Sequence, residues 1–261
     1  MRAFLLFALL FALDRGVVAA EPANSAPRPH LAIPRASIAP LMTAAVDDPA
    51  WKGAALIENL QPAYNLEMKP TTYPTTAVQA LWMPEALFLR FTATDAELFT
   101  PLAARDSDLY NGDVVEFFID PVGDGRVLYE IGAAPNGAVY DTVTLVTATP
   151  VLNEALALDW GFYGREVWHD RAWNLEGLRC SAVKTTAGWT IDVILPAKGL
   201  LRRLGTETFR AEQQLRCNVL RYEWVLGAAG KRTHLPLDWS PTAAGRPHIS
   251  AAALGTFQLL P

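Results

Sequence analysis

Short segments of alternating apolar and polar residues, separated by turns, recur along the chain from residue 77 onward. Residues 77–82 (AVQALW) and 87–91 (LFLRF) enclose the sequence Met83-Pro84-Glu85-Ala86, a pattern typical of a β-hairpin. Turns rich in proline, glycine and asparagine separate several other segments. The remaining strand-like segments are 114–120, 127–131, 138–145, 178–183, 189–195, 215–222 and 255–259. This spacing predicts antiparallel strands, because strands joined by short turns run in opposite directions.

Helix signals are few and short. Residues 153–160, with Asn153 as N-cap, and residues 197–204 each predict a brief helical segment. Because no strand–helix–strand rhythm is present, the sequence predicts an all-β fold, an antiparallel β-sandwich of two sheets with a few short helical turns. Alternation in residues 189–195 places Trp189 and Ile191 on one side of a strand, which predicts that this side is buried in the core.

The first twenty residues have the pattern of a secretory signal peptide. Arg2 precedes an eleven-residue apolar run, and Val18-Ala19-Ala20 supplies small residues before a cleavage site at Glu21. The alternative is an uncleaved anchor or a buried segment. Residues 21–38 are rich in proline and alanine and predict an extended leader, so that residues 39–261 form one domain. We therefore expect a secreted or periplasmic protein that is free of the membrane after cleavage.

Composition and motifs exclude several functions. The chain has 22 basic and 27 acidic residues, a net charge of −5, which argues against nucleic acid as a partner. The sequence contains no GxGxxG, GxSxG or HExxH motif, so an enzyme is not predicted. Glu116 and Asp192 lie within predicted strands and could form a glycosidase-like pair, but solvated or ion-paired strand residues are the favoured interpretation.

Cys180 and Cys217 both fall in strand-like segments. An oxidising compartment would permit a disulfide between them. Two buried, unpaired thiols are the alternative, and the sequence does not decide between the two.

Several short motifs follow one another in a recognisable order over about 210 residues. They are Asp47-Asp48-Pro49-Ala50-Trp51, residues 86–91 with Asp95, residues 111–121, 129–131 and 136–137, residues 188–192 with Pro196, residues 216–218, Trp239-Ser240-Pro241, His248 and Leu254-Gly255. Together they resemble carbohydrate-binding module family 9-like domains, which are immunoglobulin-like β-sandwiches of exported bacterial proteins. The resemblance implies a sugar ring held between two aromatic side chains, with carboxylate, amide or basic groups that bind its hydroxyls.

The resemblance places the first wall of this sugar site at Tyr110 and the hydroxyl acceptor at Glu116. Trp239 is the candidate for the opposite wall, by its position in a late loop. The alternatives are an ordinary loop tyrosine at Tyr110 and a lid over the core at Trp239. Trp51 is predicted to fill the core rather than to stack on a sugar.

Three further polar residues are candidates for ligand contacts, namely Arg90, Arg216 and Asn218. Each has a structural alternative. Arg90 could form an ion pair with Glu116, Arg216 could form a cross-strand ion pair, and Asn218 could be a buried hydrogen-bonding residue.

Asp120 and Asp124 flank the turn Pro121-Val122-Gly123 and could supply oxygen ligands to a structural calcium ion. Relatives of this family carry bound metal. A turn that needs no ion is the favoured alternative, because the DxDxDG pattern is absent.

The sequence therefore predicts an exported, non-catalytic carbohydrate-binding protein, which acts alone or beside glycan-degrading enzymes such as glycoside hydrolases. One alternative is a haem-binding redox sandwich, since related sandwiches hold haem b between their sheets with methionine as an axial ligand. Only Met42, Met68 and Met83 follow the predicted signal peptide. The other alternative is a sandwich that serves only as an interaction domain.

Overall fold

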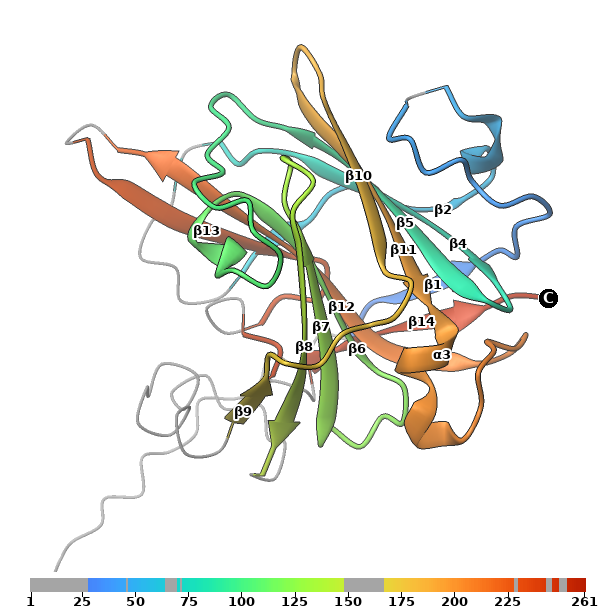
Figure 1. Ribbon diagram of the computed structural model, residues 1–261. Helices are drawn as coiled ribbons and strands as arrows, with labels where there is room; N and C mark the ends of the chain where they lie inside the picture. The colour runs from blue at the N-terminus through green and yellow to red at the C-terminus, as the bar shows by residue number, and fades with distance from the viewer. Residues whose placement is uncertain are drawn as a thin grey trace, which may run out of the picture.

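Figure 1 shows the computed structural model of the chain. The structure describes residues 28–45, 47–63, 70, 72–147, 167–227, 230–242, 246–248 and 253–261. The predicted signal peptide and the helix predicted from Asn153 lie outside the described residues. Within the described part, no helix has the length and apolar character needed to cross a bilayer.

The described strands form two sheets, which confirms the predicted all-β sandwich. The nine-stranded sheet has the order β1-β14-β12-β6-β7-β8-β9, with β13 paired to β12 and β3 paired to β13. Its strands are β1 (His30–Ile33), β3 (Gln61–Pro62), β6 (Val114–Asp120), β7 (Val127–Ala133), β8 (Val139–Val146), β9 (Val167–Asp170), β12 (Gln214–Leu226), β13 (Arg232–Asp238) and β14 (Gly255–Leu259).

The five-stranded sheet has the order β10-β11-β5-β4-β2. Its strands are β2 (Ala55–Ile57), β4 (Thr76–Met83), β5 (Ala86–Thr94), β10 (Arg179–Lys184) and β11 (Gly188–Pro196). The described helices are single short turns, namely η1 (Pro49–Trp51), η2 (Leu109–Asn111), α3 (Ala197–Leu200) and η3 (Arg202–Leu204). The hairpin predicted at Met83-Pro84-Glu85-Ala86 and the short helical turns predicted at 197–204 are thus confirmed.

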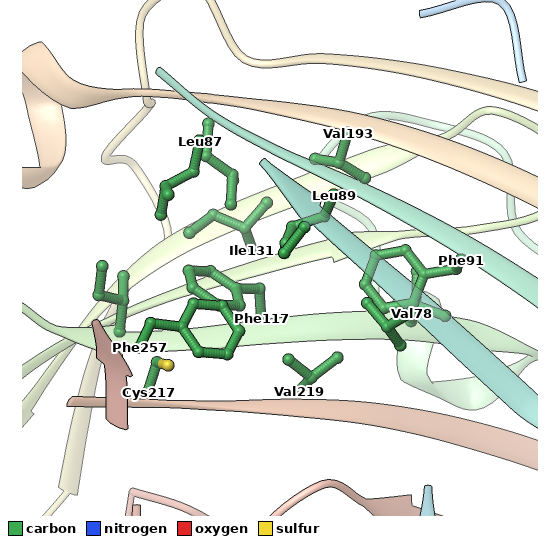
Figure 2. Close-up of a cluster of buried hydrophobic side chains, with 14 of the residues drawn as sticks. Val78, Leu87, Leu89, Phe91, Phe117, Ile131, Val193, Cys217, Val219 and Phe257 are labelled. Atoms are coloured by element: carbon green, nitrogen blue, oxygen red, sulfur yellow. The ribbon is translucent and has the colours of Figure 1, made fainter. Parts of the chain in front are cut away.

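The main hydrophobic core fills the space between the two sheets (Figure 2). Alternate residues of β5 and β11, such as Leu89 and Val193, meet alternate residues of β6 and β12, such as Phe117 and Val219. Trp189 is fully buried in this core, as predicted. The period-two alternation of each strand therefore puts its other half on the outer side of the sandwich.

The segment predicted as a leader contains part of the fold. Strand β1 pairs in parallel with β14, with His30 opposite Thr256 and Ile33 opposite Leu259. Ile33 is fully buried, and the amide of Ala36 donates to the carbonyl of Trp82. The domain therefore includes residues before 39. A strand of four residues between Pro29 and Pro34 is too short to show a clear alternation.

Both cysteines are free thiols, so the disulfide considered from the sequence is absent. Cys180 lies on β10 of the five-stranded sheet and Cys217 on β12 of the nine-stranded sheet. Packed sheets are about 10 Å apart, which exceeds the Cα separation that a disulfide bridges. Burial raises the pKa of Cys180 to about 12 and raises the pKa of Cys217 well above its ordinary value.

Candidate functional site

The candidate site lies on the side of the nine-stranded sheet that faces away from the five-stranded sheet, here called the outer face. On β6, Val115 and Phe117 enter the core between the sheets, whereas Glu116 projects to the outer face. The strand register places Gly132 of β7 opposite Glu116 and places Tyr140 of β8 opposite Gly132. These three positions form one row across β6, β7 and β8, which are neighbours in the sheet (Figure 1).

Tyr140 reaches Glu116 across Gly132. A Cβ atom at Gly132 would lie only 2.0 Å from Cε1 of Tyr140, so the tyrosine ring occupies the space of the missing side chain. Its hydroxyl oxygen contacts Oε1 of Glu116 and lies 2.8 Å from Oε1 of Glu130, which also projects from β7. The outer face thus holds two carboxyl groups bridged by one phenol.

Burial dominates the electrostatics of this group. Glu116 is 1% exposed, and its Oε2 has no hydrogen-bond partner among the described residues. Burial, together with the nearby carboxyl of Glu130, raises the pKa of Glu116 well above its ordinary value. Burial also raises the pKa of Glu130 to about 7 and that of Asp238, at the end of β13, to about 7. These groups favour their protonated forms because water is excluded from them.

Tyr110 lies at the rim of the same face, in η2, and is 38% exposed. Its ring meets the ring of Tyr140 edge to face, with centroids 6.4 Å apart. The Trp224 indole donates to the Tyr110 carbonyl oxygen at 2.9 Å, which fixes the backbone of η2 against β12. The structure therefore brings the predicted wall, Tyr110, and the predicted acceptor, Glu116, to the two sides of Tyr140.

Trp239 does not join this group. It packs against the core residue Phe257, with ring centroids 5.1 Å apart, and its ring fills the place of a side chain at Gly255. This is the position of a lid over the core, the alternative that the sequence left open. The structure does not bring Trp239 beside Tyr110, so Trp239 does not form a wall opposite Tyr110.

Solved structures of other proteins share this arrangement of strands. A candidate carbohydrate-binding protein from Bacteroides uniformis aligns with a TM-score of 0.65 and 13% identity, over 89% of this chain and 100% of that chain. A carbohydrate-binding module of family 9 from Caldicellulosiruptor kristjanssonii, in complex with cellotriose, aligns with a TM-score of 0.58 and 13% identity over 89% of this chain and 94% of that chain. The chain has the fold of carbohydrate-binding module family 9. A family 9 module from the same organism, in complex with glucose, aligns with a TM-score of 0.53 and 16% identity over 87% and 95% of the two chains.

Comparisons by sequence give no such relation. No family model matches the chain. No curated protein matches it either. The family 9 fold is thus visible in the backbone arrangement at identities of 13–16%.

Arg90 lies on the opposite sheet of the family 9 fold. Its guanidinium forms two hydrogen bonds with the carboxylate of Asp192, at 2.7 and 2.9 Å, and stacks over the Trp51 ring at 4.7 Å. The predicted alternative pair of Arg90 with Glu116 is therefore wrong, and Arg90, at 3% exposure, cannot contact a ligand at Glu116. Trp51 is buried, as predicted. Asp192 and Glu116 lie on different sheets and form no catalytic pair.

Asn218 and Arg216 hold neighbouring loops. Asn218 is fully buried; its Oδ1 accepts from the amides of Val219 and Ser240, and its Nδ2 donates to the Ser240 carbonyl. Arg216 donates to the carbonyl of Leu254. These contacts match the structural alternative for Asn218. They leave Arg216 bound to a loop carbonyl, and the cross-strand ion pair considered for it does not form among the described residues.

The two aspartates considered for calcium have separate partners. Asp120 accepts hydrogen bonds from the amides of Val122, Gly123 and Gly125, which closes the turn after β6. Asp124 forms an ion pair with Arg203 at 2.8 Å, and this contact lowers the pKa of its carboxyl. The contacts are those of the turn alternative. A calcium ion at this turn stays a prediction.

A further group of carboxyl groups could hold a cation. One oxygen each of Asp95, Asp113 and Glu223 lies within 4.8 Å of the others. Arg221 already places a positive charge among them, in contact with Glu223 and 3.9 Å from Asp95. Burial raises the pKa of Asp113 to about 6 and that of Glu223 to about 7. This group is better described as a buried ion-pair network than as a metal site.

The methionines offer no support for the haem alternative. Met42 and Met83 pack with Trp51 on the outer side of the five-stranded sheet, away from the space between the sheets. Met68 lies outside the described residues.

Sequence reasoning missed Tyr140, Glu130 and Gly132. The signal was present in the turns at 121–125 and 135–137, because hairpin turns set the register between strands. With that register, Glu116, Gly132 and Tyr140 form one row, and a glycine between two large polar residues indicates that one side chain crosses it.

Proposed function

We propose that the chain is an exported, non-catalytic carbohydrate-binding protein whose ligand binds on the outer face, against the ring of Tyr110. One observation carries the proposal. An exposed aromatic ring lies beside a pair of buried carboxyl groups on the same face of a family 9 fold. Two solved modules with this fold hold cellotriose and glucose.

The chemistry of the face suits a sugar. The C–H face of a pyranose stacks on an aromatic ring, and the half-exposed ring of Tyr110 offers such a surface. Sugar hydroxyls donate to carboxylate oxygens, and Glu116 retains one oxygen without a partner among the described residues. Because Glu116 is buried beneath Tyr140, it would accept from a sugar only after the Tyr140 ring has moved aside. Tyr110 would contact the apolar face of a sugar, and Glu116 would bind its hydroxyl edge.

Calorimetry with a panel of monosaccharides and oligosaccharides, including glucose and cellotriose, tests the proposal. Tyr110→Ala is expected to weaken binding by about 1–3 kcal/mol and to leave the melting temperature unchanged. Trp239→Ala is the matched control, since it removes an aromatic ring that packs on the core. We expect it to lower the melting temperature and leave the affinity unchanged.

Two results would contradict the proposal. A folded protein that binds no member of the panel would favour the interaction-domain alternative. An affinity that Tyr110→Ala leaves unchanged, while the sugar still binds, would place the ligand elsewhere.

Export is part of the same proposal and is supported by the N-terminal pattern of Arg2, an apolar run and small residues before Glu21. The intact mass of protein recovered from the periplasm or the medium tests it. A mature chain that begins at or near Glu21 is expected. Full-length chain retained in the membrane fraction would overturn it. A role beside glycan-degrading enzymes follows only if the protein binds their polymeric substrates.

A further inference from the structure

A single hydroxyl lies between two buried carboxyl groups on the outer face. The Tyr140 oxygen contacts Glu116 and lies 2.8 Å from Glu130. Two hydrogen bonds between this oxygen and two carboxyl oxygens require two protons, and the phenol carries only one. The second proton must therefore reside on one of the carboxyl groups, which donates to the phenol oxygen while the phenol donates to the other carboxylate.

The surroundings favour this shared proton. Glu116 and Glu130 are 1% and 7% exposed, and no lysine or arginine of the described residues forms an ion pair with either. Two adjacent buried carboxylates without a cation would repel each other strongly. Burial and the neighbouring carboxyl raise the pKa of Glu116, in the direction that this geometry requires.

We propose that Glu116, Tyr140 and Glu130 form a proton-dependent latch, which closes the outer face while the two carboxyl groups share a proton through the Tyr140 hydroxyl. When that proton leaves to solvent, two carboxylates remain, and one phenol can donate to only one of them. The ring of Tyr140 then loses one of the two hydrogen bonds that hold it across Gly132. Departure of the ring exposes both carboxylates to the outer face.

Other charged and titratable groups face the latch from each neighbouring element. Asp238 on β13 acts on Glu116, because its negative charge, once it is ionised, raises the pKa of that carboxyl further. Arg171, after β9, is paired with Asp108 and lowers the pKa of Glu130. The remaining groups are Tyr110 in η2, His169 on β9 and His248 in the segment 246–248.

The two histidines do not supply the missing cation at neutral pH. Nδ1 of His169 lies 3.9 Å from Glu130, and burial lowers the pKa of this imidazole. Burial and the neighbouring His169 lower the pKa of His248 as well. Both imidazoles therefore favour the neutral form in the pH range where the latch would lose its proton.

Infrared spectroscopy of the protein without ligand tests the latch directly. A carboxylic acid has a C=O stretch distinct from the bands of a carboxylate, and we expect this band in the wild type at about pH 6. Glu130→Gln should remove part of the band, because the glutamine amide can donate to the Tyr140 oxygen. The second hydrogen bond then needs no proton on a carboxyl group. Asp238→Asn is the control, because Asp238 is a third buried carboxyl on this face. Its replacement should remove only the contribution of Asp238 to the acid band and leave the contribution of the Glu116–Glu130 pair in place. An acid band that Glu130→Gln and Glu116→Gln both leave intact would overturn the latch.

Opening is measured by solvent-perturbation spectroscopy of tyrosine, as the difference between wild type and Tyr140→Phe. One additional exposed tyrosine should appear as the pair loses its shared proton, while the pH rises from about 5 to about 9. A difference spectrum that stays constant over this range would show that the ring does not move and would overturn the opening step. Neither measurement uses a sugar, so both decide the latch even if the proposed function fails.

The consequence for binding rests on the proposed function. Sugar hydroxyls donate to both carboxylates, so a sugar selects the open, deprotonated form and its binding releases a proton. The affinity should then rise with pH, by up to about tenfold per pH unit, over the range in which the pair loses its shared proton, a range that the raised pKa values of both carboxyl groups place above the ordinary pKa of a glutamate. Tyr140→Phe should bind more tightly at acidic pH, with a flatter profile. Sugar binding that is independent of pH in both proteins would overturn the latch as a gate and leave the proposed function standing.

Discussion

The guanidinium group of Arg221 lies over the indole ring of Trp189, 4.9 Å from the ring centre, although the two residues belong to different sheets. Arg221 is fully buried and extends from β12 to the five-stranded sheet, where it donates to the Thr94 carbonyl at 2.9 Å and to Oγ1 of Thr76 at 3.1 Å. One buried cation thus connects the two layers of the sandwich at the end where Glu223 also lies.

Removing this cation should be costly. Arg221→Met keeps an apolar stem of similar length and leaves Glu223 without its partner in a buried site. Loss of one member of a buried ion pair typically costs about 3–5 kcal/mol of unfolding free energy. Urea denaturation measures it. The double variant Arg221→Met, Glu223→Gln should recover part of the loss, because the unpaired charge is removed; a loss below about 1 kcal/mol in the single variant would contradict this account.

The indole ring of Trp189, beneath this guanidinium group, should also contribute strongly to the stability of the fold. Trp189 is fully buried, and its Nε1 donates to Asp95 at 2.9 Å. Trp189→Ala is expected to cost about 3–5 kcal/mol, as for other large aromatic truncations in cores. Trp168 supplies the matched control, because it is 63% exposed on β9 and its replacement by alanine should cost less than about 0.5 kcal/mol. Equal losses in the two variants would refute the assignment of Trp189 to the core.

Much of the fold could be predicted from alternation and turns. Strand β6 matches its predicted range residue for residue, because Val114–Asp120 is bounded by a loop and by a turn that Asp120 closes. Strand β12 runs to Leu226, four residues beyond the predicted end at Tyr222. Its last part has the charged Glu223 at a buried position and the apolar Trp224 at a partly exposed one, which hides the alternation. Burial there depends on Arg221, two residues away on the same strand, and on Asp113, which comes from a distant part of the sequence.

The candidate site was harder to predict, because the local sequence pattern of a strand does not show which of the two sheets it joins. Glu116 was placed off the core stripe correctly, yet its partner is Tyr140 rather than Arg90. Arg90 also lies off the core stripe of its strand, but alternation alone does not say which of the two outer faces a residue occupies. Only the assignment of β5 and β6 to different sheets separates Arg90 from Glu116.

Asp238 should make the stability of the protein depend on pH. Burial raises the pKa of its carboxyl to about 7 in the folded state, from an ordinary value of 3.8. A raised acid pKa means that the folded state holds the proton more tightly, so this carboxyl costs nothing below the ordinary value and destabilises the fold as the pH rises towards 7. Asp238→Asn cannot ionise, and its amide oxygen can still accept from Thr242, which donates to Asp238.

The difference in unfolding free energy between Asp238→Asn and the wild type should therefore grow from about pH 4 to about pH 7, to at most about 4 kcal/mol in favour of the variant. Burial lowers the pKa of His234 to about 4, so this residue makes the fold more stable as the pH rises, opposite to Asp238. Because His234 is present in both proteins, its contribution cancels in the difference. Urea melts at a series of pH values measure it, with Asp47→Asn at an exposed position as control. A difference that shrinks as the pH rises would show the sign to be wrong.

Gly132 allows the Tyr140 ring to cross β7, and a single methyl group tests this role. Gly132→Ala would place Cβ 2.0 Å from the ring of Tyr140, within the distance that real Cβ atoms do not show. Overpacking of this kind costs about 1–3 kcal/mol, and the ring must move away from Glu116 and Glu130. If the clash with Tyr140 is the cause, the same substitution in a Tyr140→Ala background should cost little, because the space is already empty. The double-mutant cycle measured by urea denaturation should then show a coupling of at least about 1 kcal/mol. Additive effects would mean that Gly132 is required by the backbone of β7 and not by the tyrosine that lies across it.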